Sequence, residues 1–167
     1  AVKDEIDQLP YKTMAGTRFY SKSTPLQDST AVSRLRRAGA LMVGKSSMHE
    51  LGMGVTGLNV NCGTARNPHH PDHYPGGSSS GSAVAVASGI CPLALGMDGG
   101  GSIRIPASLS GVVGLKTTWG RISRSGKAPL SWSVSTMGPL GATVEDVAAC
   151  YVKIAGPDES DESTKQQ

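Results

Sequence analysis

The chain has 167 residues, of which 38% are hydrophobic, 17% are charged and 22 are glycine. These values describe one globular, turn-rich domain and exclude a disordered chain. The net charge of +3 is weak and of mixed sign, and the basic residues form no run beyond Arg34, Arg36 and Arg37, so we expect no nucleic-acid partner.

The cysteines and the apolar runs bear on where the protein works. Three scattered cysteines, at positions 62, 91 and 150, lack C-x-x-C spacing, which predicts reduced thiols in an intracellular protein. No run reaches the roughly eighteen apolar residues that span a membrane, and the start carries no signal-peptide pattern. The chain opens within a strand-like run at residues 1–4, so we expect a fragment.

The first half of the chain alternates helix and strand signals. Residues 1–2 are predicted to end a strand. A helix is predicted over 31–38, because residues 28–30 (Asp-Ser-Thr) offer an N-cap and an apolar stripe follows them. Residues 40–43 then predict a short buried strand, and 47–51 the start of a short helix. A helix followed directly by a strand is typical of layered α/β proteins.

Residues 61–77 lack periodic apolar positions and are rich in Pro, Gly, His and Asn, which predicts a long loop. His69, His70 and His73 lie in it beside Asp72, so a metal site has to be considered. Adjacent histidines in an irregular, Pro-rich loop rarely point at one centre, and no zinc-type spacing accompanies them. We therefore expect exposed histidines and no bound metal.

The second half carries clearer helix and strand signals. Residues 83–87 are small and apolar, which predicts a tightly packed, buried helix. Residues 92–97 predict a central strand, and 112–115 form another short apolar run. Residues 143–146 (Thr-Val-Glu-Asp) make a variant capping box, which predicts a helix that ends near Gly156.

Two clusters of glycine and serine are the candidates for chemistry. In the first, residues 77–82, Ser79 completes a G-x-S-x-G pattern, but the strand that a nucleophile elbow requires does not precede it. In the second, three glycines lead from Asp98 to Ser102. Such a run suits a turn whose amides converge on one point, and equally a plain flexible loop. A phosphate cradle is a further interpretation, although neither cluster has the G-K-[ST] ending of a P-loop.

Taken together, the two clusters resemble the amidase signature family. Residues 76–83 (Gly-Gly-Ser-Ser-Ser-Gly-Ser-Ala) are similar to its GGSSGGS-type motif, and 96–106 (Gly-Met-Asp-Gly-Gly-Gly-Ser-Ile-Arg-Ile-Pro) to its D-x-G-G-S-[IV]-R-x-P motif. Ser102 follows Ser78 by 24 positions, which is the family's interval between its two catalytic serines. Residues 1–4 resemble the strand end that carries the family's catalytic lysine. The lysine of this run, Lys3, precedes Ser78 by 75 positions, which is again the family's interval.

The resemblance implies a catalytic trio. Ser102 would be the nucleophile and Lys3 the base, with Ser78 as the bridge that relays a proton between them. A lysine acts as a base only in its neutral form, which burial favours in general. The peptide bond between Gly77 and Ser78 is expected to be cis, as in the family. Lys45 lies in a more conspicuous motif, but the resemblance leaves it outside the trio.

The resemblance also implies roles around the trio. The oxyanion hole would be formed by four consecutive backbone N–H groups, those of Gly99, Gly100, Gly101 and Ser102. Ser79 would donate a supporting hydrogen bond, while Asp98 and Arg104 would hold the loop in shape. Neither a metal nor any other cofactor is expected.

Within the family, the chain is most similar to the plant-type fatty acid amide hydrolases, on the sequence of residues 50–54, 64–68, 74–77 and 98–102. This implies a Ser-Ser-Lys serine hydrolase that degrades lipids by cleaving fatty acid amides such as N-acylethanolamines. Two alternatives stay open, the glutamine amidase subunit of a tRNA-dependent amidotransferase, which works in a complex, and a general small-amide amidase. An inactive truncated product is a third possibility.

The expected partner is a small, lipid-like amide substrate. The sequence is also compatible with a homodimer. If the fatty-amide resemblance holds, peripheral contact with the endoplasmic reticulum or the plasma membrane would come from parts outside this chain, as would much of the acyl pocket.

The fold implied is α/β, with α/β/α layers around a mixed central sheet, of which this chain is an incomplete portion. Residues 1–156 would be the N-terminal and central part of the amidase domain, truncated at both ends. Residues 157–167 are acidic and polar, and we expect a polar linker or a cut end there.

Overall fold

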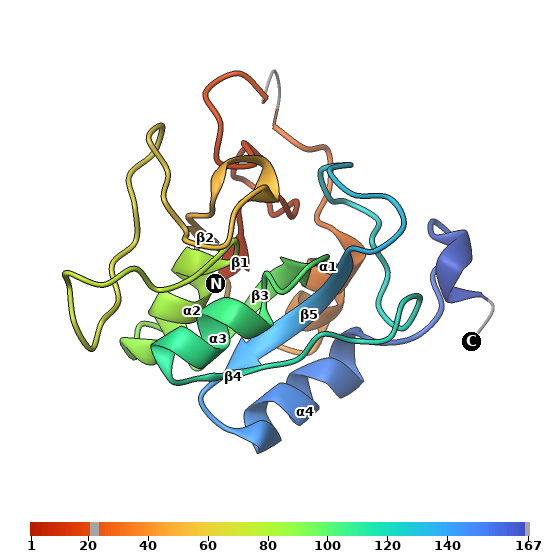
Figure 1. Ribbon diagram of the computed structural model, residues 1–167. Coiled ribbons are helices and arrows are strands. Elements are labelled where there is room, and N and C mark those ends of the chain that lie inside the picture. Colours follow the sequence, from red (N-terminus) through yellow and green to blue (C-terminus); the bar gives the residue numbers. More distant parts are fainter. Residues whose placement is uncertain (21–23, 166–167) are drawn as a thin grey trace.

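A mixed five-stranded sheet forms the centre of the computed structural model, which describes residues 1–20 and 24–165 (Figure 1). In spatial order the strands are β2 (Lys45–Ser46), β1 (Val2–Lys3), β3 (Leu93–Asp98), β5 (Thr136–Gly141) and β4 (Val113–Gly114). β1 is parallel to both of its neighbours, whereas β5 is antiparallel to both β3 and β4. The predicted mixed central sheet is therefore confirmed.

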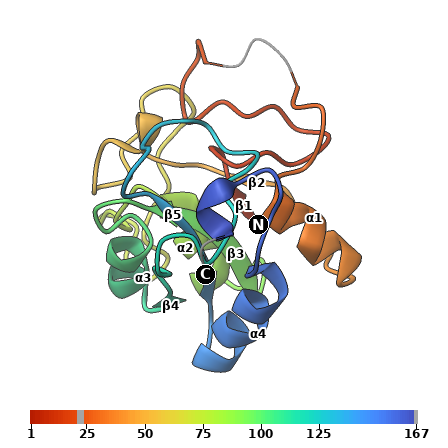
Figure 2. The ribbon, with the colours of Figure 1, turned by 90° about the vertical axis from the view of Figure 1, so that its right-hand side faces the viewer.

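Helices cover both faces of this sheet (Figure 2). On one face lie α2 (Ser80–Ala87) and α3 (Arg104–Ser110), and on the other α1 (Thr30–Arg37) and α4 (Val144–Ile154). The alternation of side chains along β3 explains why both faces are covered. Leu95 and Met97 belong to the apolar core with α1 and α4, and Ala94 to the core with α2 and α3. The predicted α/β/α layering is confirmed.

Local sequence accounts for where the helices begin. The Ser29 side chain caps α1 by accepting from the amide of Val32, and Thr143 and Asp146 form the predicted capping box of α4. The small residues of α2 let its backbone lie close to its neighbours, since a Cβ added at Gly81 would lie 2.6 Å from the amide nitrogen of Ser47. Three of the four predicted helices are therefore confirmed, those that correspond to α1, α2 and α4.

The segment around β2 differs from the prediction. Residues 40–43 do not form a strand, and β2 begins only at Lys45. Two of the apolar side chains that suggested a buried strand point outward, because Leu41 is 91% and Val43 is 55% exposed, while Met42 packs against the core. The short helix predicted from residue 47 is a single 3₁₀ turn, η1 (Glu50–Gly52).

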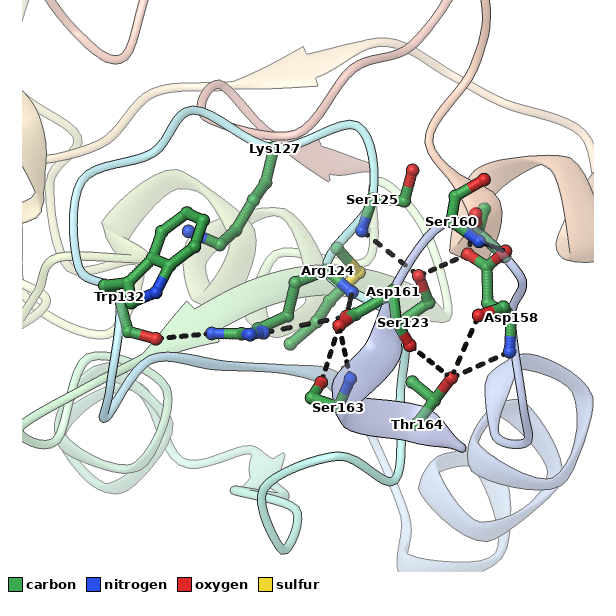
Figure 3. A network of polar contacts seen from close by, with 12 residues as sticks. Ser123, Arg124, Ser125, Lys127, Trp132, Asp158, Ser160, Asp161, Ser163 and Thr164 are labelled. Atoms are coloured by element: carbon green, nitrogen blue, oxygen red, sulfur yellow. Dashed lines mark hydrogen bonds and ion pairs between the residues drawn. The ribbon is translucent and has the colours of Figure 1, made fainter. Parts of the chain in front are cut away.

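Residues 157–164 pack against the loop 121–125 and the start of α1 (Figure 3). Asp158 and Asp161 accept hydrogen bonds from three groups of these neighbours, Thr30 Oγ1, Ser123 Oγ and Arg124 N. Burial raises the pKa of both carboxyls, but their hydrogen bonds outweigh it and lower each pKa below its usual range. The segment ends in η2 (Glu162–Thr164), whose Ser163 and Thr164 are buried.

Residues 61–77 form the predicted loop, and all three of its histidines are exposed as expected. In the described ranges, no three side chains of His, Cys, Asp or Glu gather as a metal site would require. Among those same residues, none of the helices has the length and apolar character needed to cross a membrane.

Candidate active site

The candidate residues meet at one edge of the sheet. Lys3 is the last residue of β1, and Ser102 lies in the turn between β3 and α3. Because β1 and β3 are adjacent and parallel, the segments that follow them emerge at the same edge. Ser78 reaches this edge from the loop before α2. All three residues line one cavity of about 250 Å³.

Lys3 is buried, with 1% of its side chain exposed, and its Nζ has three acceptors within reach. It donates to Ser78 Oγ at 2.7 Å and to the Met97 carbonyl at 3.4 Å. The third acceptor is Glu5 Oε1, in an ion pair at 2.7 Å. The structure thus brings two members of the predicted trio into direct contact.

Ser78 is held in place by its backbone. The Gly77–Ser78 peptide bond is cis, as predicted, and the Ser78 carbonyl accepts from the amide of His49 at 3.1 Å. Gly77 can have no side chain, because a Cβ there would lie 2.6 Å from the amide nitrogen of Gly57. These close backbone contacts fix the direction in which the Ser78 hydroxyl points.

Ser79 joins the loop before α2 to the turn after β3. Its amide donates to the Ser102 carbonyl at 3.0 Å, and its hydroxyl donates to the Met97 carbonyl at 3.3 Å. Within residues 1–20 and 24–165, Ser102 Oγ forms no hydrogen bond, so Ser78 and Ser102 share a cavity without a direct bond between their hydroxyls. The Ser102 hydroxyl is thus available to an incoming group.

Asp98 organises the turn that carries Ser102. Its buried carboxylate accepts from the amides of Gly101 at 2.7 Å, Ile103 at 3.0 Å and Arg104 at 3.2 Å. The Arg104 guanidinium adds two hydrogen bonds, each at 3.0 Å. Burial raises the pKa of Asp98, but the bonds from Arg104 and the three amides outweigh it and lower the pKa to about 2. The carboxylate therefore stays charged, and its bonds fix the shape of the loop.

The backbone amides of this turn divide into two groups. The amide of Gly101 is already bonded to Asp98. Those of Gly99, Gly100 and Ser102 donate to no acceptor in the part of the chain that the structure describes, and these three residues line the cavity. Three of the four predicted oxyanion donors are therefore free to bind a negatively charged oxygen, and one is not.

Lys45 is a second lysine with a largely covered side chain, 10% of which is exposed, but it contacts other groups. Its Nζ donates to the Ile6 carbonyl at 2.7 Å and pairs with Asp4 at 3.5 Å. Burial lowers the pKa of Lys45, although Asp4 and nearby carboxylates oppose the shift. Lys45 lines a different cavity from the one that holds Ser78 and Ser102.

Glu5 is a cavity residue that the sequence analysis does not single out. Its side chain is 6% exposed and pairs with Lys3. A glutamate in a polar stretch is ordinarily solvated, so composition gives no signal. Its contact with Lys3 comes from a turn, because the amide of Ile6 donates to the Lys3 carbonyl at 2.9 Å and folds the chain over residues 3–6.

We expect Asp98→Asn to destabilise the protein by about 2 kcal/mol at pH 7, because the shift in the Asp98 pKa corresponds to that free energy. A carboxylate whose pKa is lowered by folding stabilises the protein above its unfolded pKa, and this stabilisation is lost as the pH falls toward 2. Urea unfolding of the wild type and the variant at pH 7 and again near pH 2 measures the difference.

The matched control is Asp72→Asn, which removes the same charge from an exposed loop position. Its free energy of unfolding should stay within about 0.5 kcal/mol of the wild type. A loss for Asp98→Asn that stays equally large near pH 2 would contradict the assignment of the stabilisation to the charged carboxylate.

Known proteins match this chain over nearly its whole length. The family model described as "Amidase" matches residues 1–167. A "Fatty acid amide hydrolase" of Oryza sativa subsp. indica is 51% identical over 165 residues, which are 98% of this chain and 27% of that protein. A glutamyl-tRNA(Gln) amidotransferase subunit from Salinibacter ruber is 46% identical over 164 residues, which are 98% of this chain and 32% of that protein.

A solved structure agrees with these matches. The native peptide amidase from Stenotrophomonas maltophilia superimposes with a TM-score of 0.95 at 42% identity, over 99% of this chain and 35% of that chain. The chain thus spans about a third or less of the length of the relatives described here. The predicted fold and the predicted resemblance are both confirmed.

Proposed function

The chain belongs to the amidase family, and on that basis we propose that it forms the catalytic part of a serine hydrolase that cleaves carboxylic amide bonds. Lys3, Ser78 and Ser102 are the residues that carry the reaction. The observation that supports this most strongly is the 2.7 Å hydrogen bond between Lys3 Nζ and Ser78 Oγ, in a cavity that Ser102 also lines.

In this mechanism Ser102 Oγ attacks the carbonyl carbon of the amide. Its proton passes to Ser78, while Ser78 gives its own proton to Lys3 in the neutral form. The C–N bond then breaks, and the proton returns through Ser78 to the leaving amine. Water hydrolyses the resulting ester of Ser102, with the same relay acting in the other direction.

The negative charge that develops on the carbonyl oxygen is stabilised by the free amides of Gly99, Gly100 and Ser102. Loss of a single donor of this kind typically costs about 2.7–4 kcal/mol. Gly101 contributes indirectly, since its bond to Asp98 holds the other amides in position. Arg104 likewise supports the turn through Asp98 without contacting the substrate.

For the substrate we propose fatty acid amides such as N-acylethanolamines. The 51% identity to the Oryza sativa protein supports this choice, as do the apolar side chains of Met53, Leu130 and Val134 in the cavity lining. The whole protein would work inside the cell, and peripheral contact with a membrane and a homodimer would involve residues outside those described. The relatives from Salinibacter ruber and Stenotrophomonas maltophilia make glutamine and other small amides the alternatives to test.

The test compares three amides as substrates of the full chain, with liberated amine as the readout. We expect hydrolysis of a long-chain N-acylethanolamine by the protein alone, at a kcat/KM at least about 10-fold above those for glutamine and for acetamide. A preference of that size corresponds to about 1.4 kcal/mol, which burial of two methylene groups already supplies. Hydrolysis of glutamine only in the presence of a partner protein would contradict the proposed substrate and leave the amidase chemistry intact.

A further inference from the structure

The cavity of the candidate site contains two serines that the mechanism does not use, Ser131 and Ser135. Ser135 is only 7% exposed, and within residues 1–20 and 24–165 its hydroxyl forms no hydrogen bond. A buried polar group without a partner costs free energy, so such groups are rare in native proteins and call for an explanation. For Ser135 the explanation lies in the cavity, where a bound substrate can supply the partner.

The pairing of β3 with β5 places Ser135 beside the turn that carries the nucleophile. Asp98, the last residue of β3, lies opposite Thr136, the first residue of β5, in an antiparallel register. Gly99 and Ser135 are the next residues along the two segments, so the same register places them opposite each other. A Cβ added at Gly99 would lie 3.9 Å from the Cβ of Ser135. Ser135 is thus a direct neighbour of Gly99, whose amide is one of the free donors of the turn.

The backbone on both sides of Ser135 is held in place. Lys116 Nζ donates to the Val134 carbonyl and to Thr136 Oγ1, each at 3.3 Å. Thr136 Oγ1 in turn donates to the Asp98 carbonyl at 3.5 Å. With its backbone fixed, Ser135 has only the rotation of its side chain and hydroxyl left to adjust. A donor prepared in this way needs little reorganisation when charge develops nearby.

From this geometry we propose that Ser135 is a catalytic residue, whose hydroxyl donates a hydrogen bond to the carbonyl oxygen of the amide as that oxygen becomes negatively charged. The inference rests on the proposed function, because it concerns the same reaction. Ser135 supplies the fourth donor of the oxyanion hole, which the resemblance assigns to the amide of Gly101 and which Asp98 occupies instead. Serine hydroxyls are among the side-chain groups that act as oxyanion donors.

Ser131 has the same hydroxyl in the same cavity, but its surroundings differ. It is half-buried, so water can satisfy its hydroxyl and no ligand is needed to explain the missing protein partner. Its own loop is held through its carbonyl, which accepts from Lys127 Nζ at 3.4 Å. Ser131 is therefore the matched control for Ser135.

The test measures kcat and KM separately for the full chain and for Ser135→Ala, on whichever of the three amides compared above the wild type hydrolyses fastest. We expect kcat to fall about 10²-fold, as for the loss of one oxyanion donor, with KM within about threefold of the wild type. The reason is that the bond to Ser135 strengthens only when the oxygen becomes charged. A raised KM at unchanged kcat would place Ser135 against the ground state and overturn the proposal.

An aliphatic trifluoromethyl ketone gives a second readout, because it adds reversibly to a serine hydroxyl and forms a tetrahedral adduct with a charged oxygen. Its inhibition constant should rise about 10²-fold in Ser135→Ala, in step with the fall in kcat. If Ser135 only supported the structure, the variant would bind the ketone and the substrate more weakly by the same factor.

Three further variants separate the hydroxyl from the volume of the side chain. Ser135→Thr keeps the hydroxyl, so its kcat should lie within about 10-fold of the wild type. Ser135→Cys keeps nearly the same volume, but a thiol is a weak donor, so its kcat should fall as far as that of Ser135→Ala. Ser131→Ala should keep kcat within about threefold of the wild type.

Labelling of Ser102 by a fluorophosphonate keeps the two proposals distinguishable. An unlabelled wild-type protein would overturn the proposed function itself. A labelled and active protein in which Ser135→Ala and Ser135→Cys both keep the wild-type kcat would overturn only the role of Ser135. If Ser135→Ala proves unstable, the comparison of Ser135→Cys with Ser135→Thr still decides, because equal kcat values for these two variants would contradict the proposal.

Discussion

Ser102→Ala should abolish covalent labelling by a fluorophosphonate and lower amide hydrolysis by about 10⁶-fold, the size of loss known for removal of a serine nucleophile. Without Oγ no acyl-enzyme forms, and neither Ser78 nor Lys3 can replace it. The variant should stay folded, because Ser102 Oγ takes part in no hydrogen bond within the described residues. Mass spectrometry of the labelled protein and release of amine measure the two effects.

Ser131→Ala is the matched control, since Ser131 lines the same cavity on a different loop. It should keep both the label and most of the activity. A Ser102→Ala protein that still takes up the label at full stoichiometry would move the nucleophile to another residue, and peptide mapping of the label would identify it.

Lys3→Met should lower kcat/KM by about 10³-fold, within the range that general acid–base catalysis contributes. Methionine keeps most of the side-chain volume but accepts no proton from Ser78, so the relay ends at the bridging serine. It also leaves Glu5 without a partner in a buried site, so thermal unfolding has to be recorded alongside the kinetics.

Lys45→Met provides the comparison, because the Lys45 side chain is also largely covered but binds the Ile6 carbonyl instead of Ser78. It should lower stability more than catalysis, with kcat/KM within about 10-fold of the wild type for the protein that remains folded. A loss of about 10³-fold for Lys45→Met in a stably folded protein, with Lys3→Met active, would reverse the assignment of the base.

The helices that the sequence predicts correctly are those with local signals. α1 and α4 begin at capping side chains, Ser29 and Thr143, and α2 contains the run of small residues at 83–87. Such signals act over one turn of helix, so they survive whatever the rest of the chain does. This explains why α1, α2 and α4 could be placed from the sequence.

β5 shows what local signals miss. It contains Pro139 and two glycines, and all three disfavour a strand. The segment is extended because β3 pairs with it along its entire length, with Leu95 opposite Pro139, and because the amide of Leu115 donates to the Pro139 carbonyl at 3.1 Å. Contacts between distant segments therefore override the propensity of the residues.

α3 escapes prediction in a similar way, since Pro106 lies inside it. Proline is tolerated there because the residue falls in the first turn, where an N–H has no partner in the helix. The end of α3 does carry a signal, since Gly111 adopts the left-handed conformation with φ of 69° that often ends helices.

The same distinction between local signals and distant contacts applies to the candidate site. The intervals between the motifs identify Lys3, Ser78 and Ser102 as candidates, but they do not predict which hydroxyl contacts which amine. That Gly101 donates its amide to Asp98, and that Glu5 faces Lys3, depend on how the turns close in three dimensions. Neither contact could be predicted from residue type, propensity or spacing.

The position of β1 between β2 and β3 has a consequence for how the protein is made. Lys3 and the Met97 carbonyl, which contact each other across β1 and β3, lie 94 positions apart. A ribosome adds about 5–20 residues per second, so β1 leaves it roughly 5–20 s before β3 does. During that time an unpaired strand is exposed to other nascent chains, and charged residues discourage such pairing. We therefore expect the charges of residues 3–5, two of which line the finished cavity, to keep the nascent strand apart from other chains.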